Sequence, residues 1–251
     1  VPTPEIKPVI DLPYWETPAE KHGAPGWEER GDEFIKWLAP SVRVTAWPNG
    51  GGGSGTICYV DDDGWIYVIT CGHLYASGYR GADHYKKNPN YKNVTIYYKN
   101  NKKLDKPQSY KAETLCSVWD GVYDVALVRF KGDWTPEWVI SIAPVDYALE
   151  KGKYYHSLGC DGLRPVAHYM VKYSHSNTHN RSNYGETIEH VTTENGPRKG
   201  RSGGGVMTDD LQLVMICSRG SNSNGFWSSC QQIHKFLGKE GFQFVLDGMN
   251  L

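Results

Sequence analysis

The sequence predicts an all-β fold, a barrel or a sandwich, with an extended arm at its N-terminus and a helix near its C-terminus. Short apolar segments recur along the chain with turn residues between them, which is typical of closed or packed antiparallel sheets. The composition agrees, because 28 glycines, 14 prolines and 17 tyrosines suit many short strands joined by turns. The 251 residues are enough for one large β domain or two small ones.

Residues 1–40 are predicted to be a Pro-rich N-terminal arm. Prolines spread over its first 25 residues rule out long regular structure there, and one short helix is expected at residues 27–38, ended by Pro40. The arm either packs across the main domain or serves as a propeptide or targeting segment.

Short strands are expected along the rest of the chain. They lie at residues 42–46, 56–60, 65–70, 94–97, 111–119, 124–130, 154–158, 166–174, 188–193, 206–208 and 211–218. The glycine run at residues 50–55 lacks the end of a phosphate-binding loop and is expected to be a flexible lead-in to a strand. Residues 131–147 are a connector. A closing helix is predicted because Ser229 and Gln232 fit a capping box and Gly238 suits the position after the helix end.

The six cysteines permit three disulfides but do not require them. Cys58 and Cys71 look like a pair, yet the turn at residues 61–64 would place Cys58 opposite about Tyr67 instead. We expect mostly buried free thiols, which leaves the redox compartment open.

Charge and hydropathy argue against two classes of partner. The formal net charge is −1, and no apolar stretch approaches the length needed to cross a membrane. Residues 83–111 nevertheless mix tyrosines with a cluster of lysines, a combination that can bind nucleic acid. The lysines are Lys86, Lys87, Lys92, Lys99, Lys102, Lys103, Lys106 and Lys111. Because runs of charge mostly face solvent, we expect an exposed hairpin there and neither a nucleic-acid nor a membrane partner.

The segment Gly200-Arg201-Ser202-Gly203-Gly204 has the character of a serine nucleophile in a glycine-rich turn. A serine hydroxyl must lose its proton as it attacks, so it needs a base within hydrogen-bond reach and a third group to hold that base. Glycines allow the backbone to expose Oγ and to turn N–H groups towards a developing oxyanion.

His73, just after a strand, and Asp124, at the head of another, complete such a set. Ser202 would attack a carbonyl, neutral His73 would take its proton, and Asp124 would hold the His73 tautomer. The N–H groups of Gly200 and Ser202 would form the oxyanion hole.

The chain resembles the trypsin-like (chymotrypsin-fold) serine peptidases of bacterial type. Three motifs carry the resemblance: Thr70-Cys71-Gly72-His73, Asp124-Val125-Ala126-Leu127 and Gly200-Arg201-Ser202-Gly203-Gly204. It covers about residues 41–238 and implies two antiparallel six-stranded β-barrels. The first, at residues 41–135, would hold the histidine and the aspartate, and the second, at residues 136–251, the serine and the C-terminal helix.

The resemblance has two departures. The residue before the nucleophile is Arg201 rather than aspartate, so Val1 should not be read as an activation terminus. Leu74 stands where a cysteine normally follows the catalytic histidine, so that family's disulfide is absent there.

The resemblance also suggests substrate-binding residues. Ser218, Arg219 and Gly220 would pair with a substrate strand by β-augmentation, while Gly220 and Gly225 would wall an open P1 pocket with Gly196 at the specificity position. Basic residues cluster in sequence around this cleft: Arg198, Lys199, Arg201 and Arg219. We therefore expect a bias against basic P1 side chains and towards large apolar or acidic ones.

His175 and His179 have a metal spacing if helical, but their turn-rich segment should not hold a helix, so we expect no metal site and no cofactor. His190 is expected to be a strand residue rather than part of the cleft.

The sequence therefore predicts a serine endopeptidase that acts on proteins or peptides, in a secreted or extracytoplasmic setting by resemblance. Two alternatives stay open. One is a catalytically silent peptide-binding or scaffold module, and the other is a nucleic-acid-binding protease that processes a polyprotein.

Overall fold

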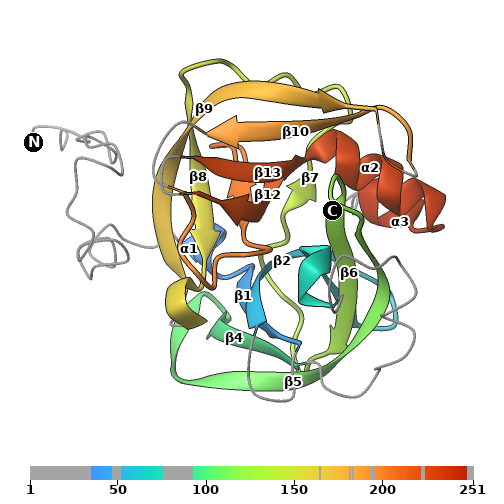
Figure 1. Cartoon of the computed structure of the whole chain (residues 1–251). Helices are drawn as coiled ribbons and strands as arrows, with labels where there is room; N and C mark the ends of the chain where they lie inside the picture. The colour runs from blue at the N-terminus through green and yellow to red at the C-terminus, as the bar shows by residue number, and fades with distance from the viewer. Residues whose placement is uncertain are drawn as a thin grey trace, which may run out of the picture.

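The computed structural model describes residues 35–46, 52–75, 93–163, 165–180, 182, 184–192, 196–221 and 224–247. The predicted Pro-rich arm lies outside these residues up to position 34. Of the helix expected at residues 27–38, the structure describes α1 (Ile35–Leu38), whose Trp37 and Leu38 are buried. Figure 1 shows two β bodies stacked one on the other, with the C-terminal helices packed at one side.

The first body is a closed antiparallel barrel with the strand order β1-β2-β3-β6-β5-β4. Its strands are β1 (Ser41–Thr45), β2 (Gly52–Val60), β3 (Trp65–Thr70), β4 (Asn93–Lys99), β5 (Lys102–Trp119) and β6 (Asp124–Lys131). Alternate residues point inward and form an apolar core that includes Val44, Ile66, Val68, Val128 and Phe130.

The second body is also a six-stranded antiparallel ring, because β11 pairs with both β8 and β12. Its strands are β8 (Tyr154–Gly159), β9 (Ala167–His179), β10 (Thr187–Thr192), β11 (Gly205–Met207), β12 (Gln212–Gly220) and β13 (Gly225–Ser229). A short parallel strand, β7 (Ser141–Ile142), adds to β12. The prediction of two six-stranded antiparallel barrels is confirmed, although the predicted strands omitted β7 and β13.

One apolar cluster joins the two barrels. It includes Ile69 and Leu127 of the first barrel and Leu158, Val206 and Ile216 of the second. This shared core holds the start of β6 against the second barrel, and the candidate site lies along this junction.

The prediction of a flexible glycine lead-in at residues 50–55 is wrong for its described part, because residues 52–55 belong to β2. The glycines are required by close packing. A methyl group on Gly52 would lie 2.0 Å from the carbonyl oxygen of Val44, and one on Gly53 would lie 2.3 Å from that of Ser202. Gly53 therefore lets the first barrel touch the glycine-rich turn of the second.

The predicted C-terminal helix is α2 (Cys230–Lys239), with the Ser229–Gln232 capping box in place. It is followed by α3 (Gln243–Leu246). Gly238 is inside the helix rather than after it. The left-handed position is taken by Gly241, whose φ is 84°, and the N–H of Phe242 donates to the carbonyl of Leu237 at 2.8 Å, which is a Schellman motif.

All six cysteines are buried free thiols. Cys58 lies at a bulge between β2 and β3 and its thiol donates to the carbonyl of Tyr67 at 3.6 Å, close to the expected pairing. Within the described residues, no helix is both long and apolar enough to span a membrane.

Candidate active site

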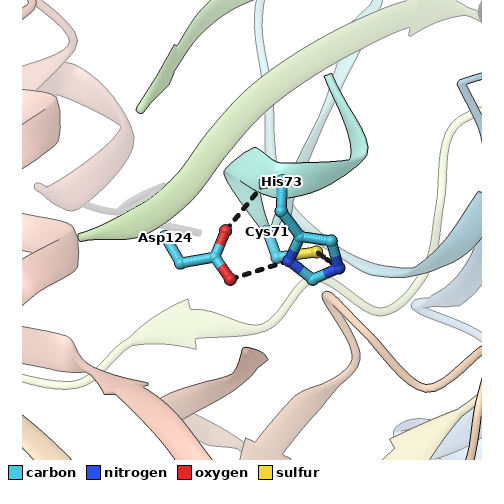
Figure 2. A group of neighbouring side chains, drawn as sticks. All are labelled: Cys71, His73 and Asp124. Carbon is cyan, nitrogen blue, oxygen red and sulfur yellow. Dashed lines mark hydrogen bonds and ion pairs between the residues drawn. The ribbon is translucent and has the colours of Figure 1, made fainter. Parts of the chain in front are cut away.

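His73 and Asp124 are brought together by the pairing of β3 with β6. Thr70 at the end of β3 lies opposite Ala126 near the start of β6, so the 3₁₀ turn Gly72–Leu74 meets the first residue of β6. One carboxylate oxygen of Asp124 accepts the backbone N–H of His73 at 2.8 Å, and the other lies 2.8 Å from Nδ1 of the ring (Figure 2). The two bonds fix both the position and the orientation of the imidazole.

Asp124 is almost fully buried and is tied to the second barrel as well. The hydroxyl of Ser218 on β12 donates to Oδ2 of Asp124 at 2.6 Å, and that of Ser228 on β13 donates to its main-chain carbonyl at 3.1 Å. Charge-assisted bonds of this kind are among the stronger hydrogen bonds in proteins. The carboxylate therefore sits where the barrels meet.

The pKa of His73 is raised above its ordinary value of 6.5. Burial acts to lower this pKa, but the negative charge of Asp124 and its hydrogen bond to the ring together outweigh burial. The ring thus remains a competent base once deprotonated, with a proton affinity above that of a free imidazole.

Cys71 lies beside the same ring, with its Sγ 3.7 Å from Nε2 of His73 (Figure 2). Burial, followed by the charge of Asp124, raises the pKa of this thiol well above its usual value, so it stays neutral. Across the described ranges, Cys71, His73 and Asp124 are the one group of three whose metal-ligating atoms converge, within 4.8 Å of one another. A soft metal ion would find sulfur and nitrogen ligands there, while the carboxylate is already bonded to the ring.

The turn that carries Ser202 packs directly on the segment that leads to His73. The carbonyl of Ser202 accepts the N–H of Ser54 at 2.7 Å, and a methyl group on Gly203 would lie 2.9 Å from the backbone nitrogen of Cys71. Among the described residues, the ring of His73 is hydrogen-bonded to Asp124 and Cys71 and not to Ser202. Such contacts are often loose before substrate binds.

The peptide between Lys199 and Gly200 has a defined orientation. The N–H of Arg201 donates to the carbonyl of Arg198 at 3.1 Å, and Gly200, the third residue of this turn, has a φ of 96°, which makes it a type II turn. The carbonyl of Lys199 accepts the N–H of Gly162 at 2.6 Å, so in a trans peptide the N–H of Gly200 points the opposite way. Within the described part of the chain, neither this N–H nor that of Ser202 donates to a backbone carbonyl.

Ser54 holds the other side of Gly200 and was missed by the sequence reasoning. Its hydroxyl donates to the carbonyl of Gly200 at 2.8 Å and accepts the N–H of Cys160 at 2.7 Å. The side chain of Ser54 is fully buried. The main-chain carbonyl of Ser54 accepts a hydrogen bond from the hydroxyl of Thr70 at 2.6 Å. A serine within a Gly-rich strand carries no local signal for this role, because both partners are far away in the chain.

Arg201 is fully buried and does not face a cleft. Its Nε and Nη2 lie 2.8 and 2.9 Å from the two carboxylate oxygens of Asp161, in the short 3₁₀ segment Asp161–Leu163 that follows β8. The guanidinium also lies over the ring of Tyr169, 3.5 Å from its centroid, and donates to the hydroxyl of Ser157 at 3.2 Å. Arg201 thus ties the turn that carries Ser202 to the segment that follows β8.

Arg219 is a second basic residue of the predicted cleft cluster whose charge is matched. It is half exposed, and its Nη2 lies 2.8 Å from the buried carboxylate of Glu189 on β10. Two of the four basic residues expected around the cleft, Arg201 and Arg219, are thus paired with carboxylates, which weakens the charge argument against basic P1 side chains.

The predicted pocket walls Gly220 and Gly225 pair with each other across β12 and β13. Both are in contact with Pro197, since a methyl group on either would lie within 3.1 Å of its ring. The expectation of an open pocket between these glycines is therefore not met.

His175, His179 and His190, the other histidines considered in the sequence, lie in strands. His175 and His179 lie four apart on the extended strand β9, which rules out the helical metal spacing. His190 on β10 is buried, its Nδ1 lies 2.9 Å from the hydroxyl of Ser176, and burial lowers its pKa to about 4.

The lysine segment is partly described. Lys86, Lys87 and Lys92 lie outside the described residues. The lysines of β5 (Lys102, Lys103, Lys106 and Lys111) are exposed, and Lys99 on β4 pairs with Asp133 at 2.9 Å. The exposure expected for this hairpin is thus found on the first half of β5, whereas β4 is mostly buried.

The chain is similar to known proteins in sequence motif and in fold. A family model described as a trypsin-like peptidase domain matches residues 53–216. The active form of the Rv3671c protease from Mycobacterium tuberculosis has a TM-score of 0.60 at 16% identity, covering 96% of this chain and 94% of that chain.

Two further solved structures share the fold. The inactive form of the Rv3671c protease has a TM-score of 0.58 at 18% identity, covering 83% of this chain and 92% of its own. The serine endoprotease from Yersinia pestis has a TM-score of 0.55 at 16% identity, covering 86% of this chain and 66% of that chain. No curated protein sequence matches this chain.

Proposed function

The chain belongs to the trypsin-like peptidase family, and from this premise we propose that it is a serine endopeptidase with Ser202 as nucleophile, His73 as general base and Asp124 as the group that orients the base. The observation that carries the proposal is the pair of bonds from Asp124 to His73, with the Ser202 turn packed on the same segment.

In the proposed reaction, Oγ of Ser202 attacks the carbonyl carbon of the scissile peptide bond and its proton passes to Nε2 of His73. The imidazolium that forms is stabilised by Asp124 through Nδ1. It then gives the proton to the leaving amine as the carbon–nitrogen bond breaks, which leaves an acyl group on Ser202. A water molecule, deprotonated by His73, hydrolyses this ester and restores the enzyme.

The N–H groups of Gly200 and Ser202 are proposed to bind the oxyanion of each tetrahedral intermediate. The type II turn supports this role, because it directs the Gly200 N–H away from Gly162. Donors that are held in place before the reaction contribute more than mobile ones, since no reorganisation is needed as charge develops.

The substrate is proposed to be a protein or peptide that lies in extended form beside the end of β12, at Ser218, Arg219 and Gly220. Such pairing uses main-chain hydrogen bonds and leaves sequence preference to the side-chain pockets.

The proposal is tested with a fluorophosphonate probe, which phosphonylates an activated serine irrespective of peptide sequence. Mass spectrometry should locate the adduct on Ser202 in the full chain, with labelling lost in Ser202→Ala and strongly reduced in His73→Ala. Ser141→Ala, at an exposed serine of β7, is the matched control and should label normally. A correctly folded protein that does not label would contradict the proposal and would be a latent enzyme or a peptide-binding module.

A further inference from the structure

Pro197 lies against Gly220 and Gly225, the two predicted walls of the P1 pocket. In the proposed enzyme the P1 side chain would pass between the segment that precedes the nucleophile, which includes Gly196 and Pro197, and the facing segment of β12 and β13, which includes Gly220 and Gly225. The absence of side chains on those two glycines would ordinarily leave an open slot.

The two walls are in contact. A methyl group on Gly220 would lie 2.4 Å from Cδ of Pro197 and 3.0 Å from its backbone nitrogen. A methyl group on Gly225 would lie 3.1 Å from the same Cδ. The proline ring therefore occupies the space that the glycines leave.

A second contact joins the same two segments at Gly196, next to Pro197. A methyl group on Gly196 would lie 2.0 Å from the carbonyl oxygen of Ser221 and 2.7 Å from that of Asn224. Ser221 and Asn224 are themselves joined in a tight turn, because the N–H of Ser221 donates to the carbonyl of Asn224 at 2.8 Å. The walls thus meet at two successive positions.

The inner end of this region is filled as well. A methyl group on Gly225 would lie 2.6 Å from Nε1 of Trp227 and 2.8 Å from the hydroxyl of Thr192, and these two groups are hydrogen-bonded at 3.2 Å. Trp227 is almost fully buried. Trp227 and Thr192 therefore occupy the space that a side chain on Gly225 would need.

A flat side chain inserted between two walls needs about 3.5–4.0 Å to each, so the wall atoms must stand roughly 7–8 Å apart. Between Pro197 and Gly220 even one added methyl carbon would lie only 2.4 Å from Cδ of the proline, so this space does not hold a side chain between the two walls. A small P1 side chain needs no such depth, because a methyl or hydroxymethyl group stays at the rim.

Building on the proposed function, we infer that Pro197 is a specificity-determining residue that closes the S1 subsite, so that the enzyme cleaves after small residues, namely glycine, alanine and serine. This replaces the sequence-based expectation of large apolar or acidic P1 side chains. The glycines at 220 and 225 are then needed to accommodate Pro197 rather than to admit substrate.

The test is a cleavage profile of the full chain on a peptide library with all residues at P1, read by mass spectrometry. Alanine at P1 should be cleaved with a kcat/KM at least tenfold above that for phenylalanine, leucine or glutamate. Pro197→Gly should reduce this preference to threefold or less by gaining activity on larger residues. Pro165→Ala, at an exposed proline of the second barrel, should keep the wild-type profile.

The same samples are labelled with the fluorophosphonate, which carries no P1 side chain, so that the two proposals are judged separately. Labelling of Ser202 together with a profile dominated by large P1 residues would overturn the inference and leave the peptidase proposal standing. Labelling without cleavage of any small-P1 peptide would also overturn it. An absence of labelling would overturn the peptidase proposal and, with it, this inference.

Discussion

Asp161 holds Arg201 through both of its carboxylate oxygens, at 2.8 and 2.9 Å, in a region where the guanidinium has no solvent exposure. The pair joins the loop after β8 to the residue immediately before Ser202. The motif that the segment around Ser202 resembles has aspartate or asparagine at the position of Arg201. In this chain the positive charge therefore lies beside the nucleophile, and its counter-ion comes from within the second barrel.

Asp161→Asn should lower the free energy of unfolding by about 3–5 kcal/mol, because it leaves the buried Arg201 without its counter-ion. Urea denaturation followed by tryptophan fluorescence measures this loss. Glu150→Gln, which breaks an exposed ion pair with Lys153 at 3.0 Å, is the control and should cause no measurable change. If both variants unfold at the wild-type urea concentration, the buried pair does not anchor the turn.

Ser54→Ala should lower kcat while leaving KM nearly unchanged. The variant frees the carbonyl of Gly200 and loosens the peptide that orients the oxyanion-hole N–H, at a cost of about 1–3 kcal/mol for an unsatisfied buried group. A similar loss should appear in the affinity for a peptide boronate, whose tetrahedral adduct uses the oxyanion hole.

The control for Ser54 is Ser41→Ala. Ser41 is also buried, and its hydroxyl also donates to a main-chain carbonyl, that of Trp37 at 2.9 Å, but away from the site. A purely structural role for Ser54 predicts that both variants lose stability and keep the wild-type kcat. That result would contradict the positioning role.

Gly200→Ala should abolish most activity, because a type II turn requires a positive φ at this position and alanine favours rotation of the Lys199–Gly200 peptide. Loss of one oxyanion donor costs about 10²–10³ in kcat. Gly152→Ala is matched in backbone strain, with a φ of 85° and open space around it. Both variants should lose about 1–2 kcal/mol of unfolding free energy, because alanine is strained at a positive φ. Gly152→Ala, however, should keep the wild-type kcat.

The pH dependence of kcat/KM should show an acid limb with a pKa above 6.5. His73 must be neutral to accept a proton, and Asp124 raises its pKa against the opposing effect of burial, so activity is lost at a higher pH than for a free imidazole. His156 and His190 cannot produce this limb, because burial lowers the pKa of both, that of His190 to about 4.

Asp124→Asn provides the check on the assignment of the limb to His73. It removes the negative charge and leaves burial, so the acid limb of the residual activity should move below 6.5, together with a fall in kcat of about 10⁴. His73 is not the titrating base if the acid limb of the wild type has a pKa at or below 6.5. The same conclusion follows if Asp124→Asn leaves the pKa of the limb unchanged.

The fold class could be predicted from the sequence because each strand has its own local pattern. The short apolar runs of β3 and β6 and the capping box at Ser229 depend on neighbours within a few residues. The predictions that were wrong concern segments whose conformation depends on contacts with another part of the chain. Gly52 and Gly53 must be glycines because β1 and the Ser202 turn approach them closely, and Gly238 continues a helix that Gly241 ends.

By itself, the sequence determined which residue types are available for the proposed chemistry, since His73, Asp124 and Ser202 each stand in a recognisable local motif. Only the tertiary structure decided what surrounds them. Asp161 lies 40 positions from Arg201, and Ser54 lies 146 positions from Gly200. No local pattern encodes such contacts, because barrel closure and the packing of the two barrels bring these segments together. For the same reason, a glycine in the sequence shows that a side chain is absent but not what fills its place.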